Sequence, residues 1–371
     1  MTAQFNGRPR RSTASSLTFL DPPEITLQFA PAIPSTGPLR QPGDIDKLLA
    51  GELTSPVVFR HSGWQPMRRR ILRAMAEQGY STDRLLRFAR CGNRAYVMCR
   101  TDNPTIVRVA GSCCRDRWCQ PCARDRARTI AANLLEYTAG RQLRFLTLTL
   151  KHQPISLSEQ LDRLCFCFTA LRRTKFWKAA VKGGCHMIEI TRNATTATWH
   201  PHLHIIIEGS YLPHQRIRNQ WLKITGDSHI VDIRAVKDHR EVHRYISKYV
   251  TKPWSGDTAR EPSILAETMR ALDGKRLCNT FGTWRDLALT DVPVSDAWEN
   301  LGSLDDFLRR ARAGEELAIE VLSHLEHTAV QAAMARLPIE PESHHDPPTD
   351  LDWHRQYDFF DRFEPSGWHH S

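Results

Sequence analysis

The pattern of hydrophobic and polar positions is most regular between residues 143 and 252. Residues 143–150 alternate with a period of two and contain many strand-forming side chains, which predicts a β-strand. The same reasoning predicts strands at residues 187–191, 202–207 and 229–233. A short polar loop separates the second and third of these strands, so we expect the two to form a hairpin.

Predicted helices alternate with these strands. Ser156 and Glu159 have the spacing of a capping box, which predicts the start of a helix that runs to about residue 176. A second helix is expected at about 214–224, and a third begins near Asp238 and is stopped by Pro253. The order strand, helix, strand, strand, helix, strand, helix favours an α+β fold with helices on one face of an antiparallel sheet.

The charge of the chain indicates an anionic partner. Its 371 residues include 51 Lys and Arg against 41 Asp and Glu, which gives a formal net charge of +10. A basic surface concentrates phosphate-bearing ligands, so nucleic acid is the first candidate and a membrane surface is the alternative. We find neither a signal peptide nor the roughly 20 apolar residues that span a bilayer, and therefore expect a soluble, cytoplasmic protein without a membrane partner.

Two histidines on the third predicted strand form a candidate metal site. His202 and His204 share a face of the strand because alternate side chains project to the same side. Glu189, on the neighbouring strand of the hairpin, is the expected third ligand; an ordinary surface glutamate is the alternative. Imidazole suits several transition metals, and a carboxylate shifts the preference toward Mn²⁺ or Mg²⁺. His200 shares the face, but the following proline distorts its approach, so we expect it at most to support the site.

The last predicted helix carries two tyrosines and two lysines. Tyr245 and Tyr249 are four residues apart, as are Lys248 and Lys252, so each pair shares a helix face. A phenol with its ordinary pKa near 10 is a poor nucleophile at neutral pH, and a nearby metal ion or lysine would favour the phenolate. An amphipathic helix with half-buried tyrosines is the alternative explanation.

Taken together, these motifs resemble those of a known superfamily. The chain contains residues 145–150, then His200-Pro201-His202-Leu203-His204, then Tyr245-Ile246-Ser247-Lys248-Tyr249-Val250-Thr251-Lys252. In this order they resemble the three motifs of HUH endonucleases, specifically of the rolling-circle replication initiators of small plasmids and single-stranded phages.

The resemblance implies a site-specific nuclease that also rejoins DNA ends. A divalent metal on His202, His204 and Glu189 would polarise a phosphate, and a tyrosine would attack it. The products would be a 5′-phosphotyrosine link and a free 3′-hydroxyl, which can prime DNA synthesis.

The resemblance also assigns roles to the residues of the last helix. By its place in the motif, Tyr249 is expected to attack first, and Tyr245 would make a second cut possible. Lys252 would contact the phosphate or the surroundings of the metal, and Lys248 is a further candidate.

Six of the ten cysteines lie between residues 91 and 122, which in a long basic chain indicates a metal site rather than disulfides. Cys114, Cys119 and Cys122 resemble the cysteine segment that precedes the first motif in many plasmid initiators. Tetrahedral zinc needs a fourth ligand, for which we choose Cys91 over Cys99 or Cys113. Nearby arginines are candidates for binding DNA phosphates; they are Arg115, Arg117, Arg124 and Arg126.

Five parts of the chain follow from these patterns. Residues 1–55 are rich in proline and are expected to form a mobile arm. A helical, cysteine-rich zinc module at 56–130 and the HUH nuclease domain at 140–258 would follow. Residues 259–337 are expected to be helical, and residues 338–371 to be a disordered tail.

Two other functions fit the same motifs. A transposase of the HUH type would share the chemistry, and a zinc-containing DNA-binding regulator would use the histidines and tyrosines only for packing. Because no phosphate loop of the helicase type appears, we expect a host helicase and polymerase as partners on single-stranded or origin DNA.

Overall fold

The computed structural model describes residues 42–193, 195–238, 241, 242, 245, 260–290 and 297–337. Most of the predicted N-terminal arm, the predicted C-terminal tail and Lys248, Tyr249 and Lys252 lie outside these residues. None of the helices in the described part of the chain is both long and apolar enough to cross a membrane.

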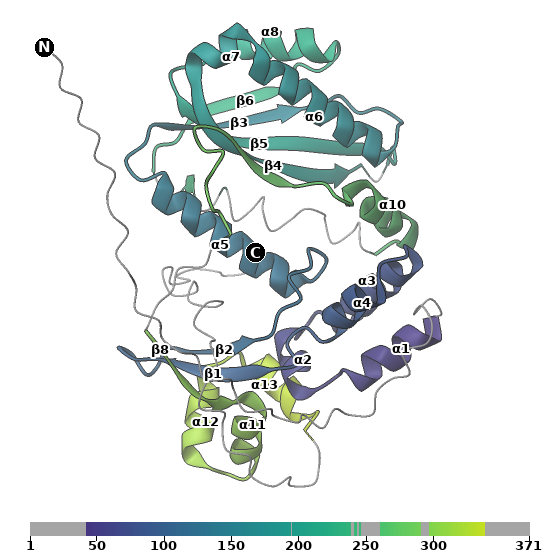
Figure 1. The fold of residues 1–371 in the computed structure, drawn as a ribbon, viewed down its shortest axis with the longest axis vertical. Coiled ribbons are helices and arrows are strands. Elements are labelled where there is room, and N and C mark those ends of the chain that lie inside the picture. Colours follow the sequence, from purple (N-terminus) through teal and green to yellow (C-terminus); the bar gives the residue numbers. More distant parts are fainter. Residues whose placement is uncertain are drawn as a thin grey trace, which may run out of the picture. The chain divides into compact units, whose positions relative to one another are not determined.

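A five-stranded antiparallel sheet forms the centre of the fold (Figure 1). Its strands are β3 (Leu143–Thr149), β4 (Val181–Arg192), β5 (Trp199–Gly209), β6 (Val231–Ala235) and β7 (Cys278–Gly282). They lie in the order β6-β3-β5-β4-β7, and every neighbouring pair is antiparallel. The predicted α+β class with an antiparallel sheet is confirmed. All four predicted strands are present, and β4 and β5 form the predicted hairpin.

Three helices cover one face of this sheet: α6 (Leu157–Arg173), α7 (Lys175–Ala180) and α8 (His214–Thr225). Leu161, Leu164 and Phe168 of α6 belong to one buried cluster with Leu203 and Ile205 of β5. The predicted capping box starts α6. The Ser156 hydroxyl accepts a hydrogen bond from the Glu159 backbone N–H at 3.3 Å, and the Glu159 carboxylate accepts one from the Ser156 N–H at 2.9 Å.

The opposite face of the sheet is divided into an apolar and a polar half. Helix α5 (Gln120–Tyr137) contributes Ile130 and Leu134 to a buried cluster with Phe145, Met187 and Ile206 of the sheet. In Figure 1, α5 lies on the side of the sheet opposite α6. The prediction placed helices on one face; α5 covers the apolar half of the other face and leaves the polar half for the histidines.

Helices at the start of the described chain pack on one another. They are α1 (Pro42–Gly51), α3 (Gln65–Glu77) and α4 (Thr82–Ala89), and α10 (Pro262–Leu272) contacts α3; α2 (Ser55–Arg60) instead packs on α13 (His327–Met334). Ile45 and Leu48 of α1 are buried, so the part of residues 1–55 that the structure describes is helical. Ser81 caps α4 by accepting a hydrogen bond from the Arg84 N–H.

A second sheet joins two segments that are distant in sequence. It has the order β2-β1-β8, with β1 (Ala95–Arg100), β2 (Val107–Gly111) and β8 (Trp298–Ser303). Helices α11 (Leu304–Arg312), α12 (Glu316–Ser323) and α13 (His327–Met334) follow β8. The predicted helical region after residue 259 therefore also contains β7 and β8. Val97 packs with Leu304 and Phe307 in a hydrophobic cluster that is separate from the clusters of the five-stranded sheet.

Candidate active site and cysteine cluster

The polar half of the sheet face carries the two histidines at the centre of β5. His202 lies opposite Thr149 of β3 and Glu189 of β4, and His204 lies two residues further along the same face. The two imidazole rings are 6.2 Å apart and nearly parallel, with an interplanar angle of 25°. Leu203, between them, is buried on the other face. The structure thus brings together the three residues that the sequence predicted as metal ligands.

The His204 side chain contacts one carboxylate and two hydroxyls. Its Nε2 lies 2.8 Å from Glu189 Oε2, and its Nδ1 lies 3.2 Å from the Tyr245 hydroxyl and 3.4 Å from Thr147 Oγ1. Since a carboxylate only accepts, Nε2 donates to Glu189. His204 is 6% exposed, so its orientation is fixed by these partners.

His202 is held by two hydroxyls. Its Nδ1 lies 3.2 Å from Thr149 Oγ1 and its Nε2 lies 3.3 Å from Thr191 Oγ1. Burial lowers the pKa of His202 to about 4, and the neighbouring His200 adds to this effect. The ring is therefore neutral at neutral pH, which is the form that binds metal ions. Two imidazoles and a carboxylate fit a divalent ion of the Mn²⁺ kind.

Two further histidines continue this row toward the surface. His200 Nε2 donates to the Leu150 carbonyl at 3.0 Å, and its ring lies 3.7 Å from the ring of the exposed His152. The His200 and His202 rings are 4.1 Å apart. His200 therefore contacts a predicted ligand, in the supporting place expected of it. His152 was not predicted, because it lies outside the strands and its sequence context has no metal-site spacing.

Tyr245 lies at the buried end of the polar half of this sheet face. Its ring stacks on Phe145 at 4.1 Å with an interplanar angle of 19°, and the side chain is 7% exposed. Its hydroxyl contacts His204, so the predicted tyrosine segment reaches the histidine pair. The threonines that hold the histidines were missed, although the alternation of Thr147 and Thr149 on β3 places them on the same face.

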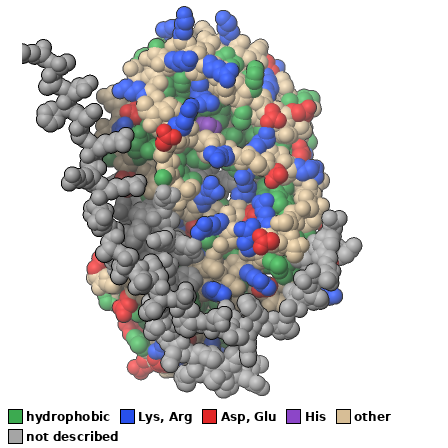
Figure 2. All heavy atoms as spheres, in the orientation of Figure 1, with side chains coloured by type: hydrophobic (Ala, Val, Ile, Leu, Met, Phe, Trp, Pro, Cys, Tyr) green, Lys and Arg blue, Asp and Glu red, His purple; other side chains and the backbone are tan. Residues whose placement is uncertain are grey.

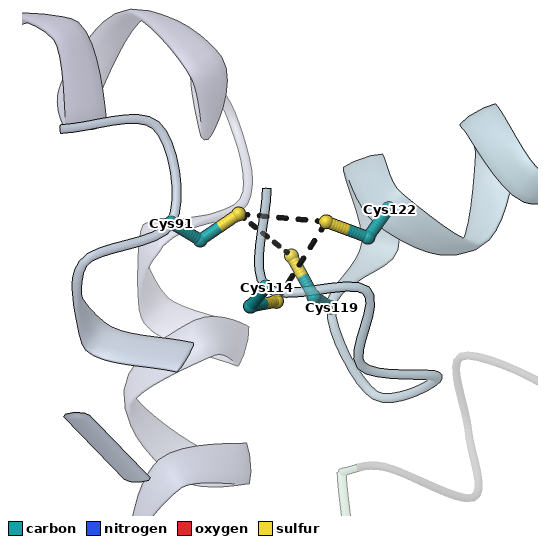
Figure 3. A group of neighbouring side chains, drawn as sticks. All are labelled: Cys91, Cys114, Cys119 and Cys122. Carbon is teal, nitrogen blue, oxygen red and sulfur yellow. Dashed lines mark hydrogen bonds between the residues drawn. The ribbon is translucent and has the colours of Figure 1, made fainter. Parts of the chain in front are cut away.

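Four cysteines form a cluster at the start of α5 (Figure 3). Among the described residues, Cys91, Cys114, Cys119 and Cys122 place their sulfur atoms within 4.8 Å of one another. Cys91 Sγ is 3.7 Å from Cys119 Sγ and 3.5 Å from Cys122 Sγ. Zinc–sulfur bonds of about 2.3 Å in a tetrahedron separate the sulfurs by about 3.8 Å. The cluster could therefore hold zinc, and Cys91 is the member that the sequence left most open.

The contacts among the four sulfurs lower the pKa of Cys91 and Cys122 and raise the pKa of Cys114 and Cys119, so they favour thiolate at the first two. Hydrogen bonds from the Cys114 and Cys119 thiols lower the pKa of Cys91 to about 4. Thiolate is the form of cysteine that binds zinc. Cys99 lies elsewhere, on β1, where its thiol contacts the Pro104 carbonyl.

The arginines proposed for DNA binding have different surroundings. Arg115, Arg124 and Arg126 are exposed. Arg117 instead donates to the Leu272 and Lys275 carbonyls, each at 2.9 Å, and so ties the cysteine loop to the end of α10. Figure 2 shows Lys and Arg side chains spread over the face in view, with fewer acidic side chains between them.

Comparisons with known proteins agree on one class. A family model described as "Replication protein" matches residues 106–318. "Protein rep" of a Bacillus species is 31% identical over 145 residues, which make up 35% of this chain and 47% of the relative. "Protein rep" of Streptococcus pneumoniae serotype 2 is 27% identical over 236 residues, 57% of this chain and 73% of the relative.

These matches cover different shares of the relatives. "Protein rep" of Bacillus amyloliquefaciens is 31% identical over 140 residues, 33% of this chain and 41% of the relative. The chain thus spans less than half the length of the two Bacillus relatives. No solved structure matches the chain at the same level of significance.

Proposed function

This chain belongs to the replication protein family, and on that premise we propose that it initiates rolling-circle replication by cutting and rejoining one DNA strand. The observation that carries the proposal is the meeting of His204, Glu189 and Tyr245 on the polar half of one sheet face. The resemblance to rolling-circle replication initiators noted from the motifs agrees with this family.

His202, His204 and Glu189 would hold the divalent metal, Mn²⁺ or Mg²⁺. When bound, the ion polarises the scissile phosphate and stabilises the charge that develops on it. Thr147 and Thr149 orient the two imidazoles from the neighbouring strand. The two histidines lie on β5, which is anchored in the core. This anchoring keeps both ligands fixed, as a metal site requires.

Tyr249 would be the first nucleophile. Its phenolic oxygen forms a bond to the phosphorus, the bond to the 3′-oxygen breaks, and the products are a 5′-phosphotyrosine and a free 3′-hydroxyl. The energy of the broken bond is kept in the new ester, so the reverse reaction rejoins DNA ends. Lys252 and Lys248 would bind the phosphate. Tyr249 and both lysines lie outside the described residues, so their roles rest on the motif.

Tyr245 would serve a second cut. Its hydroxyl lies on His204 and its ring is packed on Phe145. The burial of this phenol supports Tyr249 as the residue that reaches the first phosphate. The cysteine cluster would hold a structural zinc ion at the start of α5.

The substrate would be single-stranded or origin DNA, on which a host helicase and polymerase continue the reaction. A transposase of the same chemistry would act on element ends instead. A DNA-binding regulator without catalysis would need neither the hydrogen bond between His204 and Glu189 nor the one between His204 and Tyr245.

The test is the formation of a covalent adduct. The protein is incubated with labelled single-stranded DNA that carries the origin sequence and with Mn²⁺, then run on a denaturing gel. We expect an adduct with the wild type, its loss in Tyr249→Phe and in His204→Ala, and its retention in Tyr245→Phe. Loss only in Tyr245→Phe would reverse the order of the tyrosines, and no adduct on any origin strand would contradict the nuclease.

A further inference from the structure

We propose that Arg60 is a positioning residue of the cysteine cluster. It binds one zinc ligand directly and balances the charge of the thiolates. The inference rests on the proposed zinc site. Arg60 ends α2 and is 62 residues before Cys122 in sequence, so nothing in the spacing of the cysteines points to it.

One nitrogen of Arg60 contacts two residues of α5. Its Nη2 donates to Cys122 Sγ at 3.5 Å and to Asp125 Oδ2 at 2.8 Å. The Arg60 side chain is 15% exposed, so both interactions are largely shielded from solvent. Cys122 and Asp125 lie three residues apart, on the same side of the first turns of α5. Arg60 thus fixes the direction in which the helix presents its sulfur.

The stem of Arg60 also shapes the chain beside a second ligand. Gly92 follows Cys91 and has a φ of +91°. A Cβ at this position would lie 2.8 Å from Arg60 Cδ and 3.0 Å from Arg60 Cβ. The position therefore needs glycine for its backbone conformation and for the space that Arg60 occupies. Arg60 contacts the surroundings of Cys91 with its stem and Cys122 with its tip.

The charge of a loaded cluster explains why a buried arginine is useful there. Four thiolates around one divalent ion leave two net negative charges, which are costly in a buried place unless cations compensate them. Arg60 supplies one such cation at hydrogen-bond distance. Arg68 is 1% exposed and donates to the carbonyl of Ala89, the last residue of α4 and two residues before Cys91. Hydrogen bonds from outside the ligand set orient ligands and strengthen metal binding.

A second ion pair in the same loop provides a matched control. Arg84 Nε lies 2.6 Å from Asp116 Oδ2, and the two side chains are 28% and 5% exposed. Asp116 lies between the ligands Cys114 and Cys119, and its other oxygen accepts the Trp118 N–H at 2.9 Å. Arg84→Met therefore breaks a comparable ion pair of the cysteine loop. In this pair Asp116 binds a backbone N–H, whereas Arg60 binds a sulfur.

The experiment measures metal release and needs no DNA. Full-length wild type, Arg60→Met and Arg84→Met are loaded with zinc, and release to a chromogenic chelator is followed. The absorption spectrum of the Co²⁺-loaded proteins reports whether four thiolates still bind. We expect Arg60→Met to release zinc roughly 10- to 100-fold faster than Arg84→Met, with the tetrathiolate spectrum retained in both. Equal release rates would overturn the proposal.

Two outcomes remain separate from this comparison. Wild type that binds less than one zinc per chain contradicts the zinc site itself, and the proposal for Arg60 fails with it, whatever the result of the DNA adduct test. If Arg60→Met does not fold, Arg60→Lys and Arg84→Lys replace the pair. Lysine keeps the charge but lacks the planar guanidinium, so Arg60→Lys is still expected to release zinc several-fold faster than Arg84→Lys, and equal rates would again refute the proposal.

Discussion

His204 is oriented by Glu189 on one ring nitrogen and by the hydroxyls of Tyr245 and Thr147 on the other. These partners come from different segments of the chain, and together they fix both the tautomer and the rotation of the ring. The carboxylate is the one group among them that carries a full charge. Its removal should therefore affect metal binding more than the fold.

Glu189→Gln keeps the size of the side chain and removes the charge. We expect the Mn²⁺ concentration for half-maximal adduct formation to rise roughly 10- to 100-fold, with adduct restored at high Mn²⁺. Glu208→Gln is the control, because Glu208 lies on β5 but binds Arg141 and the Trp284 indole. An unchanged Mn²⁺ requirement in Glu189→Gln would remove Glu189 from the ligand set.

His186 makes folding sensitive to acid. Burial lowers the pKa of His186 to about 4, and Arg172 adds to the effect. Its ring lies between Phe168 and Phe281. An unfolded histidine has a pKa near 6.5, so between pH 6.5 and 4 the unfolded state binds a proton that the folded state does not. The free energy of unfolding therefore falls as pH falls through this window.

The check is urea unfolding at several pH values. From pH 7 to pH 4.5 the wild type is expected to lose about 2 kcal/mol more than His186→Gln. The titration of His202 is common to both proteins and cancels in the comparison. Parallel pH dependences of the two proteins would show that His186 is not the acid-sensitive group.

At the scale of elements, the hairpin of β4 and β5 determines where the site lies. Its register sets Glu189 opposite His202, and a shift of one residue would turn the histidines into the α6 face. Close packing at the other end of β4 maintains this register. A Cβ at Gly184 would lie 2.2 Å from the Ile206 carbonyl oxygen and 2.8 Å from Phe281 Cζ.

Gly184→Ala should destabilise the protein by about 3 kcal/mol, because backbone of β5 and a ring on β7 must move. The matched change is Gly51→Ala at the end of α1, where nothing lies within 4 Å of the added carbon. That variant is expected to be neutral or slightly stabilising. Urea midpoints measure both, and equal midpoints for the two variants would contradict the close approach at Gly184.

At the scale of the whole molecule, the excess of basic residues should appear as salt-dependent DNA binding. Arg124 and Arg126 are exposed near the start of α5, whereas Arg87 and Arg90 pair with Asp83 and Glu52. For single-stranded DNA, each phosphate contact contributes about −0.7 to the slope of log K against log salt.

The double variant Arg124→Gln, Arg126→Gln is therefore expected to reduce the slope by about 1.4 in magnitude. The double variant Arg87→Gln, Arg90→Gln should leave it close to that of the wild type. Fluorescence anisotropy with a labelled single strand at several salt concentrations measures both. Equal slopes in the two double variants would place the DNA path away from α5.

Elements with local signals could be predicted from the amino-acid sequence. Alternation over residues 143–150 predicts β3, a capping box predicts the start of α6, and the His-x-His spacing in a strand is enough to place both rings on one face. The ordered motifs also indicated the family. These features depend on the chain's own periodicity, so they do not require knowledge of distant contacts.

Features that depend on distant partners became visible in the folded chain and could not be predicted from local patterns. Strands β7 and β8 are five and six residues long and are defined by pairing with β4 and β1, far away in sequence. Cys91 and Arg60 both contact the Cys122 sulfur, because the packing of helices brings these three residues together. Burial then sets the protonation of His202 and His186, since the cost of a charge depends on what surrounds it in space and not on its neighbours in the sequence.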